Sequence, residues 1–124
     1  MKCEKPITQN VREKANKLYA YFTTHPYYCT KEELELELGV GERIVRDIIA
    51  LLRSKGVPII STSGSKGYKL ARLDNDDDYE KIKYMWAEID SRIEELEINR
   101  KCCMRFVEQY EKRIQNNVLK GKSL

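Results

Sequence analysis

Residues 43–53 combine arginines with an aspartate and an alanine at helical spacing. At about 100° per residue, one side of a helix, opposite its apolar positions, carries Arg43, Arg46, Asp47 and Ala50, with Arg53 beside them. An arginine can donate two hydrogen bonds to guanine, an aspartate can accept one from cytosine, and an alanine lets a base approach closely. The set is therefore a candidate surface for contacting DNA bases, although an ordinary solvated helix face has the same composition.

Further residues are candidates for phosphate contacts. Thr30 and Lys31 stand at an expected helix start, where backbone N–H groups and the helix dipole attract anions. A turn-rich segment and the strand after it contribute Ser65, Lys66 and Lys69, and lysines there suit phosphate or minor-groove contacts. The alternative is that these lysines only keep the surface soluble.

Apolar residues at spacings of three and four predict three helices that would position these side chains. The first covers about residues 9–23, the second begins at Thr30 and ends at residues 39–41, and the third follows directly and ends before residue 56. Thr30 and Glu33 form a capping box, in which the hydroxyl accepts from the Glu33 amide and the carboxylate reaches the Thr30 amide. The expected inward-facing residues are Val11, Ala15, Leu18, Phe22, Leu34, Leu38, Val45, Ile48, Ile49 and Leu52.

A β-hairpin is expected after the third helix. Residues 57–62 and 68–73 have strand character, and the turn-rich residues 63–67 separate them. Residues 27–29 leave room only for a small strand or an extended link before the second helix. Two helices joined by a three-residue turn that contains glycine, followed by a hairpin, form the plan of a winged helix-turn-helix, whose second helix of the pair enters the DNA major groove.

The sequence resembles winged-helix domains of the type found at the N-terminus of the biotin repressor and in many bacterial regulators. The residues that carry this resemblance are 30–34, 38–46, 52–59 and 64–70. Its most specific parts are Gly56-Val57-Pro58-Ile59 and Gly67-Tyr68-Lys69-Leu70. The resemblance implies DNA binding and, for many members, transcriptional control. The sequence departs from this family at Gly41, where members usually have Ser, and at Ile44, where they usually have Thr. Glu42 also brings a negative charge to the start of the third helix, where it complements the helix dipole but would repel a nearby phosphate.

Residues 74–124 predict one long amphipathic helix of about 40 residues, because no glycine or proline occurs between Tyr68 and Lys120. Asp77 and Glu80 form a second capping pair. A heptad seam of apolar residues is expected to hold a homodimer: Tyr79, Ile82, Trp86, Ile89, Ile93, Leu96, Cys103, Val107, Tyr110 and Ile114, interrupted by Arg100 and Asn117. The alternatives are a break near residues 99–100 that gives a helical hairpin, and either orientation of the paired helices.

Composition excludes several classes of function. The 124 residues carry a net charge of +3, divided into +5 for residues 1–73 and −2 for residues 74–124, so the positive field belongs to the first part. The chain has a single histidine, His25, and four cysteines without a Cys-x-x-Cys pair, so we expect no metal, no cofactor and no enzyme activity. No apolar run suits a membrane span or a signal peptide, which favours a cytoplasmic protein that does not bind a membrane.

The sequence therefore predicts a mainly α fold with a small β-hairpin, made of a winged helix-turn-helix domain at residues 1–73 and a long coiled-coil helix at residues 74–124. The predicted function is sequence-specific binding of double-stranded DNA as a homodimer, with transcriptional regulation as its purpose. The alternative is an adaptor in a replication, partition or DNA-packaging complex, in which the winged helix and the coil contact proteins.

Overall fold

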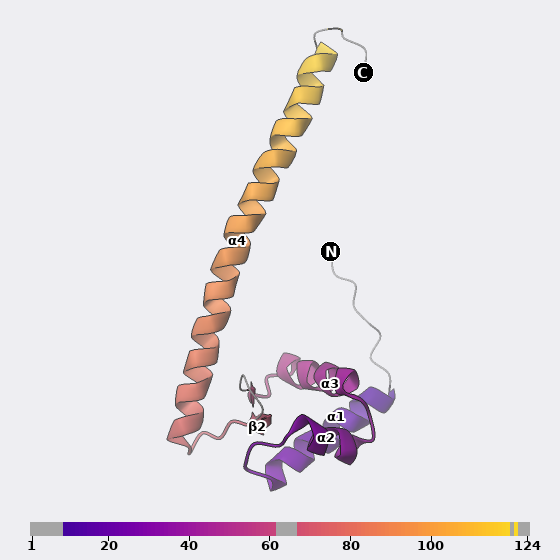
Figure 1. The fold of residues 1–124 in the computed structure, drawn as a ribbon, viewed down its shortest axis with the longest axis vertical. Helices are drawn as coiled ribbons and strands as arrows, with labels where there is room; N and C mark the ends of the chain where they lie inside the picture. Colours follow the sequence, from indigo (N-terminus) through magenta and orange to yellow (C-terminus); the bar gives the residue numbers. More distant parts are fainter. Residues whose placement is uncertain (1–8, 62–66, 120, 122–124) are drawn as a thin grey trace. The chain divides into compact units, whose positions relative to one another are not determined.

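Four helices and two short strands form the part of the chain that the computed structural model describes, residues 9–61, 67–119 and 121 (Figure 1). In chain order these elements are α1 (Gln9–Thr24), α2 (Lys31–Leu38), α3 (Glu42–Ser54), β1 (Ile59–Ser61), β2 (Tyr68–Leu70) and α4 (Asp76–Leu119). The predicted mainly helical fold with a small hairpin is confirmed. The chain divides into two compact units, Met1–Lys83 and Tyr84–Leu124, so the first two turns of α4 group with the N-terminal unit, beyond the boundary predicted after residue 73.

The three N-terminal helices pack around one apolar core. The predicted inward-facing residues from Ala15 to Leu52 are all buried there, and Val11 packs against them half-buried. The core also includes Cys29, which lies just before α2, and Ile59, the first residue of β1. Periodic spacing of the apolar residues therefore identified the packed face of each helix.

The cap of α2 confirms half of the predicted capping box. The Thr30 hydroxyl accepts a hydrogen bond from the Glu33 amide at 3.1 Å. The Glu33 carboxylate, which was expected to reach the Thr30 amide, accepts from the Tyr21 hydroxyl of α1. This hydrogen bond and burial raise the pKa of Tyr21 above its ordinary value. The carboxylate thus ties α2 to α1, a contact that local sequence rules do not describe.

The hairpin is shorter than the sequence predicted, and residues 27–29 extend its sheet by one bridge. β1 and β2 pair antiparallel, with Ile59 opposite Leu70, and Cys29 exchanges backbone hydrogen bonds of 2.7 and 2.9 Å with Tyr68. Gly67 makes this close approach possible, because it has a φ of 93° and an added Cβ would lie 2.1 Å from the Cys29 carbonyl oxygen. Residues 27–29, predicted to form a small strand or an extended link, therefore contribute a single bridge at Cys29.

The long helix α4 runs without interruption over 44 residues. It continues through residues 99–100, so the alternative of a helical hairpin there is wrong. The start also differs from the prediction, since the Asn75 side chain accepts a hydrogen bond from the Asp78 amide at 3.0 Å and caps the first turn in place of Asp77. Within the described residues, no helix is long and apolar enough to cross a membrane.

Candidate nucleic-acid interface

The predicted base-contacting residues lie on the exposed side of α3. Val45, Ile48, Ile49 and Leu52 are buried against the core, which turns the opposite side of the helix to solvent. That side carries Arg43, Arg46, Asp47 and Ala50, all exposed. The helix begins after Gly41, which makes no side-chain cap, so the first N–H groups of α3 are left for other acceptors. The four predicted residues therefore share one solvent-exposed side of α3, and their contact with bases stays a prediction.

Glu42 places a carboxylate among the candidate cations. Its Oε1 atom accepts from the Lys31 ammonium at 2.5 Å, and its Oε2 atom lies 2.9 Å from the Arg46 guanidinium. The hydrogen bond from Lys31, followed by the charges of Lys31 and Arg46, lowers the pKa of Glu42 below its ordinary value. Glu42 stays ionised at neutral pH and joins the start of α2 to the first turn of α3. The four-residue spacing between Glu42 and Arg46 in one helix could have predicted their ion pair from sequence, whereas the pair with Lys31 joins two helices.

Arg53 is directed at the hairpin. Its guanidinium donates to the Ile59 carbonyl at 2.7 and 3.2 Å and to the Ser61 hydroxyl at 3.2 Å. Burial lowers the pKa of Arg53 from its ordinary value, which agrees with a half-enclosed position. The prediction placed this side chain beside the base-contacting set, whereas the structure uses it to brace α3 against β1. The acceptor is a backbone carbonyl, which every residue has, so no residue type in the sequence indicates this hydrogen bond.

Lys69 corrects the sequence-based interpretation of the hairpin. Lys69 is 6 % exposed, and its ammonium forms an ion pair with Asp78 in the first turn of α4. The same carboxylate oxygen accepts from the Arg72 amide at 3.0 Å. An ammonium in this position cannot reach a phosphate, so the prediction of a phosphate contact by Lys69 is wrong. We call Lys69, Asp78 and the Arg72 amide the β2–α4 clasp.

The four other candidate phosphate contacts, Thr30, Lys31, Ser65 and Lys66, have different outcomes. Thr30 and Lys31 are exposed at the start of α2, where the Thr30 hydroxyl is the N-cap and the Lys31 ammonium is shared with Glu42. Ser65 and Lys66 lie outside the residues that the structure describes. The helix start therefore brings Thr30 and Lys31 close to the exposed side of α3, and the contribution of the hairpin tip stays a prediction.

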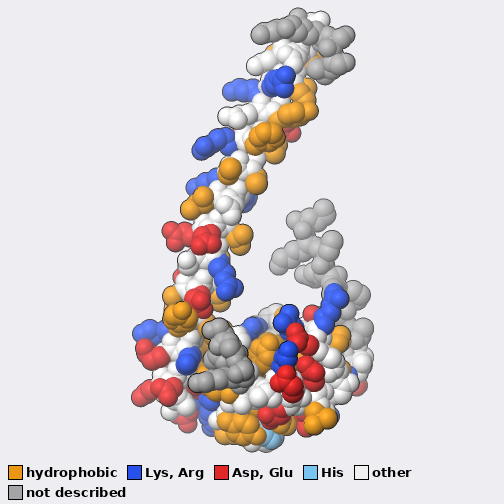
Figure 2. Space-filling model, in the orientation of Figure 1, with side chains coloured by type: hydrophobic (Ala, Val, Ile, Leu, Met, Phe, Trp, Pro, Cys, Tyr) orange, Lys and Arg blue, Asp and Glu red, His pale blue; other side chains and the backbone are white. Residues whose placement is uncertain are grey.

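The seam on α4 is unburied in a single chain. Trp86, Ile89, Ile93 and Leu96 are each about half exposed or more, and Figure 2 shows apolar side chains spread along the visible face of the helix. Ile82 and Ile114 are partly covered. The remaining seam residues Tyr79, Cys103, Val107 and Tyr110 are exposed. The seam therefore has the surface of a helix that can pair, and pairing itself stays a prediction.

The cysteines differ in environment. Cys29 is fully buried, and burial raises the pKa of its thiol from 9.0 to about 12, so it remains protonated. Cys102 and Cys103 are free and exposed on α4. In the part of the chain that the structure describes, no three His, Cys, Asp or Glu side chains gather to hold a metal ion.

Comparison with known proteins supplies an independent identification of the N-terminal unit. Residues 14–69 match the family model of an HTH domain. This segment is a helix-turn-helix domain. It includes the α2–turn–α3 unit and reaches into β2, so the hairpin makes the domain a winged helix-turn-helix. No curated protein matches the chain. The family supports DNA binding by this domain, and α4 lies beyond the matched residues.

Proposed function

We propose that the protein is a homodimer that binds specific sequences in double-stranded DNA and regulates transcription. The observation that carries the proposal is the exposed side of α3 in a helix-turn-helix domain, where Arg43, Arg46, Asp47 and Ala50 face away from the core. In this class of domain the corresponding helix lies in the major groove. Such a function requires no cofactor and no catalytic step, and a DNA partner agrees with the expected cytoplasmic location.

Recognition would divide between the two helices of the motif. Arg43 and Arg46 can donate to guanine O6 and N7, and Asp47 can accept from cytosine. Lys31 and the start of α2 lie beside them and suit a phosphate, which fixes the position of the helix without specifying sequence. When α3 enters the major groove, phosphates and bases would replace Glu42 as the partners of Lys31 and Arg46. The hairpin would contribute through its tip residues, Ser65 and Lys66.

The test is a selection of bound sequences from random duplex, followed by affinity measurements on the selected and on random DNA. Arg46→Ala is expected to lose about 1–3 kcal/mol on the selected sequence and much less on random DNA, because a bidentate guanine contact exists only where guanine is present. Arg12→Ala is the matched control, since Arg12 is an exposed arginine of α1 outside the proposed interface. Equal weakening on both DNAs would reduce Arg46 to a phosphate contact.

The dimer is tested on α4. Ile89→Asp with Ile93→Asp places two carboxylates in the seam and should convert a dimer into a monomer in sedimentation at micromolar concentration, because burying unpaired charges is strongly unfavourable. Ser91→Asp adds one carboxylate between them on the outer side of the helix and should leave the dimer intact. A monomeric parent protein would contradict the homodimer.

An adaptor module is the second candidate function, and the ion pairs favour it. Lys31 and Arg46 share Glu42, Arg53 is bonded to the hairpin, and Lys69 is buried with Asp78. Fewer cations are therefore free for phosphates than the sequence suggested. Measuring DNA affinity against salt distinguishes the candidates, because each phosphate contact contributes about 0.9 to the log–log slope. A flat response without an enriched sequence would favour the adaptor.

A further inference from the structure

Charge is distributed unevenly along α4. Residues 76–97 carry nine acidic and three basic side chains, a net charge of −6, whereas residues 98–119 carry five basic and two acidic side chains, a net charge of +3. Figure 2 accordingly shows mainly blue charged side chains towards the C-terminal end of the helix. The two halves of one helix therefore have opposite charge.

The helix dipole does not account for this distribution. Acidic side chains stabilise the first turn and basic ones the last turn, but the effect fades beyond those turns. Asp76, Asp77 and Asp78 fall in the first turn. Glu94, Glu95 and Glu97 lie near the middle of the helix, more than four turns from its start. Their concentration in the N-terminal half requires a different explanation.

We infer that the seam of α4 is covered by α4 of a second copy lying antiparallel, an inference that rests on the proposed homodimer. Antiparallel pairing sets the acidic half of each helix beside the basic half of the other. Paired helices lie about 8–10 Å apart, which is close to the Debye length of about 8 Å at physiological salt, so charges on the two helices still interact. Parallel pairing would instead set the net-negative half of one helix beside the net-negative half of the other, and the net-positive halves likewise.

One antiparallel register pairs every position of the seam. It places residues equally far from position 98 opposite each other, and each layer then joins an a to a d position of the heptad. The layers are Tyr79 with Asn117, Ile82 with Ile114, Trp86 with Tyr110, Ile89 with Val107, Ile93 with Cys103, and Leu96 with Arg100. Shifting the second helix by a heptad in either direction leaves part of the seam uncovered.

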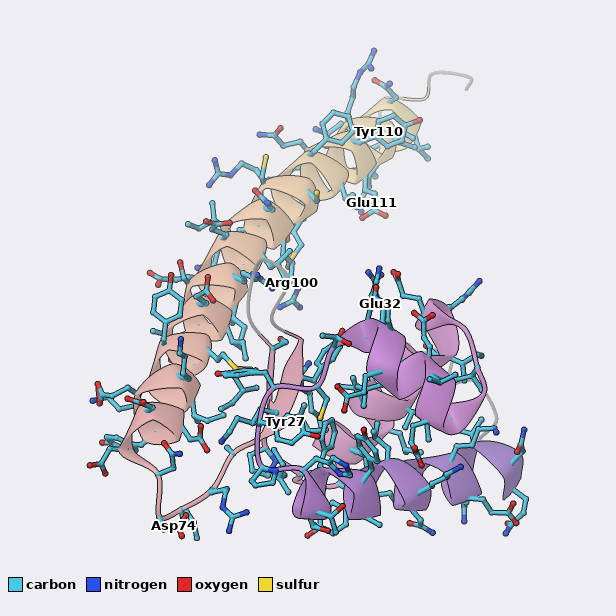
Figure 3. All side chains as sticks on the ribbon, turned by 60° about the horizontal axis from the view of Figure 1, so that its bottom comes forward. Tyr27, Glu32, Asp74, Arg100, Tyr110 and Glu111 are labelled. Atoms are coloured by element: carbon cyan, nitrogen blue, oxygen red, sulfur yellow. The ribbon has the colours of Figure 1, made fainter. Side chains whose placement is uncertain are left out.

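Arg100 favours the same orientation. Its side chain projects from the exposed middle of α4 in Figure 3 and interrupts the apolar seam. In a parallel pair two Arg100 guanidiniums would face each other in the seam. In the antiparallel pair each lies level with Leu96 of the second copy and one residue from its Glu97, so the aliphatic stem packs on leucine and the guanidinium meets a carboxylate.

The apolar side chains beside the seam agree with this arrangement. Met85 and Phe106 both occupy the g position of the heptad, and Phe106 is 68 % exposed in a single chain. Antiparallel helices bring g positions next to g positions, and the register centred on residue 98 sets Met85 next to Arg113 and Phe106 next to Arg92 of the second copy, where aliphatic arginine stems can cover them. Parallel helices would set these two residues beside Asp90 and Glu111, where apolar surface meets carboxylates.

The orientation has a consequence for DNA binding. In an antiparallel pair the first turns of the two α4 helices lie at opposite ends, about 60 Å apart at 1.5 Å per residue. The β2–α4 clasp attaches each winged-helix domain to its own first turn. The two domains are therefore expected near opposite ends of the helix pair, so selected DNA should contain two separate half-sites.

Disulfide trapping in the full-length chain tests the orientation. The background carries Cys3→Ser, Cys102→Ser and Cys103→Ala, and the two test proteins add Ile82→Cys or Ile114→Cys. They are oxidised with glutathione disulfide, each alone and after mixing and exchange of chains. The antiparallel register predicts a covalent dimer only in the mixture, because a disulfide needs Cα atoms about 4.4–6.8 Å apart and only residues 82 and 114 of different copies meet.

Each other outcome has a separate meaning. Covalent dimers of either variant alone would show parallel helices and overturn the inference while leaving the homodimer intact. A non-covalent dimer that forms no disulfide even in the mixture would overturn the proposed register. A monomer in sedimentation would overturn the proposed function instead. Ser91→Cys in the same background is the matched control and should give no covalent dimer, because it lies on the outer side of the helix.

Discussion

Replacing Lys69 by methionine is the sharpest test of how the N-terminal unit is held together. Lys69 and Asp78 are 6 % and 3 % exposed, and the Asp78 carboxylate has the Lys69 ammonium and the Arg72 amide as its partners. Methionine has nearly the same length as the lysine stem, so the substitution removes the charge and keeps most of the volume. It leaves the Asp78 carboxylate buried with a single backbone donor.

The expected magnitude follows from this burial. Removing one partner of a buried ion pair destabilises a protein by about 3–5 kcal/mol, because the remaining charge is left without compensation. Lys83→Met is the matched control, since Lys83 pairs with Glu80 at 3.6 Å and both side chains are more than half exposed. An exposed pair contributes at most about 1 kcal/mol. The two variants remove the same charge and differ in burial.

Hydrogen exchange of the α3 amides in the native full-length chain is the appropriate assay, because it reports the opening of the N-terminal unit separately from α4. Lys69→Met should accelerate exchange of the most protected amides by about two to four orders of magnitude. Lys83→Met should change it by less than tenfold. Equal effects of the two variants would show that removing Lys69 does not leave Asp78 as a buried charge without a partner, and would refute the reasoning.

Four further predictions concern single side chains. Lys69→Met should leave the salt dependence of DNA affinity unchanged, whereas Lys31→Ala should lower its slope by about 0.9, in titrations at several salt concentrations. Glu42→Gln should strengthen binding to selected and random duplex alike in the same titrations, because it removes a negative charge that competes with phosphate. Gly67→Ala should lower the thermal midpoint, since its Cβ would meet the Cys29 carbonyl oxygen at 2.1 Å. Stability should fall as the pH rises from about 9 to about 12, because only the unfolded chain releases the Cys29 proton in that range, and Cys29→Ala should reduce the slope in urea titrations.

Sequence patterns predicted the parts of the fold that depend on neighbouring residues. The apolar spacing of α1, α2 and α3 identified their buried sides, and the Thr30 cap marked the start of α2. These signals are local, because a helix repeats every 3.6 residues and its cap lies within one turn. The exposed side of α3 followed from the same periodicity. The winged plan was recognisable for this reason.

Contacts between elements were not predictable in the same way. In β2, Lys69 lies between the half-buried residues Tyr68 and Leu70, and this alternation predicts an exposed lysine. The prediction fails because Asp78 of α4 lies on that side of the strand and pairs with Lys69, which is buried. Arg53 was expected beside the base-contacting residues, but its acceptor is the carbonyl of Ile59. Glu33 likewise bonds Tyr21, twelve residues away. Each partner comes from another element, so spacing rules for one helix or strand do not reveal it.

Whether an ion pair is exposed or buried distinguishes the basic side chains that are available to DNA from those that hold the fold together. The pairs that Glu42 makes with Lys31 and Arg46 are exposed, and exposed pairs contribute little to stability, so a phosphate or a base can replace the carboxylate without unfolding anything. The pair between Lys69 and Asp78 is buried, and breaking it would open the domain. We therefore expect DNA binding to draw on the start of α2, the exposed side of α3 and the residues between the two strands, while the lysine of β2 joins the hairpin to α4.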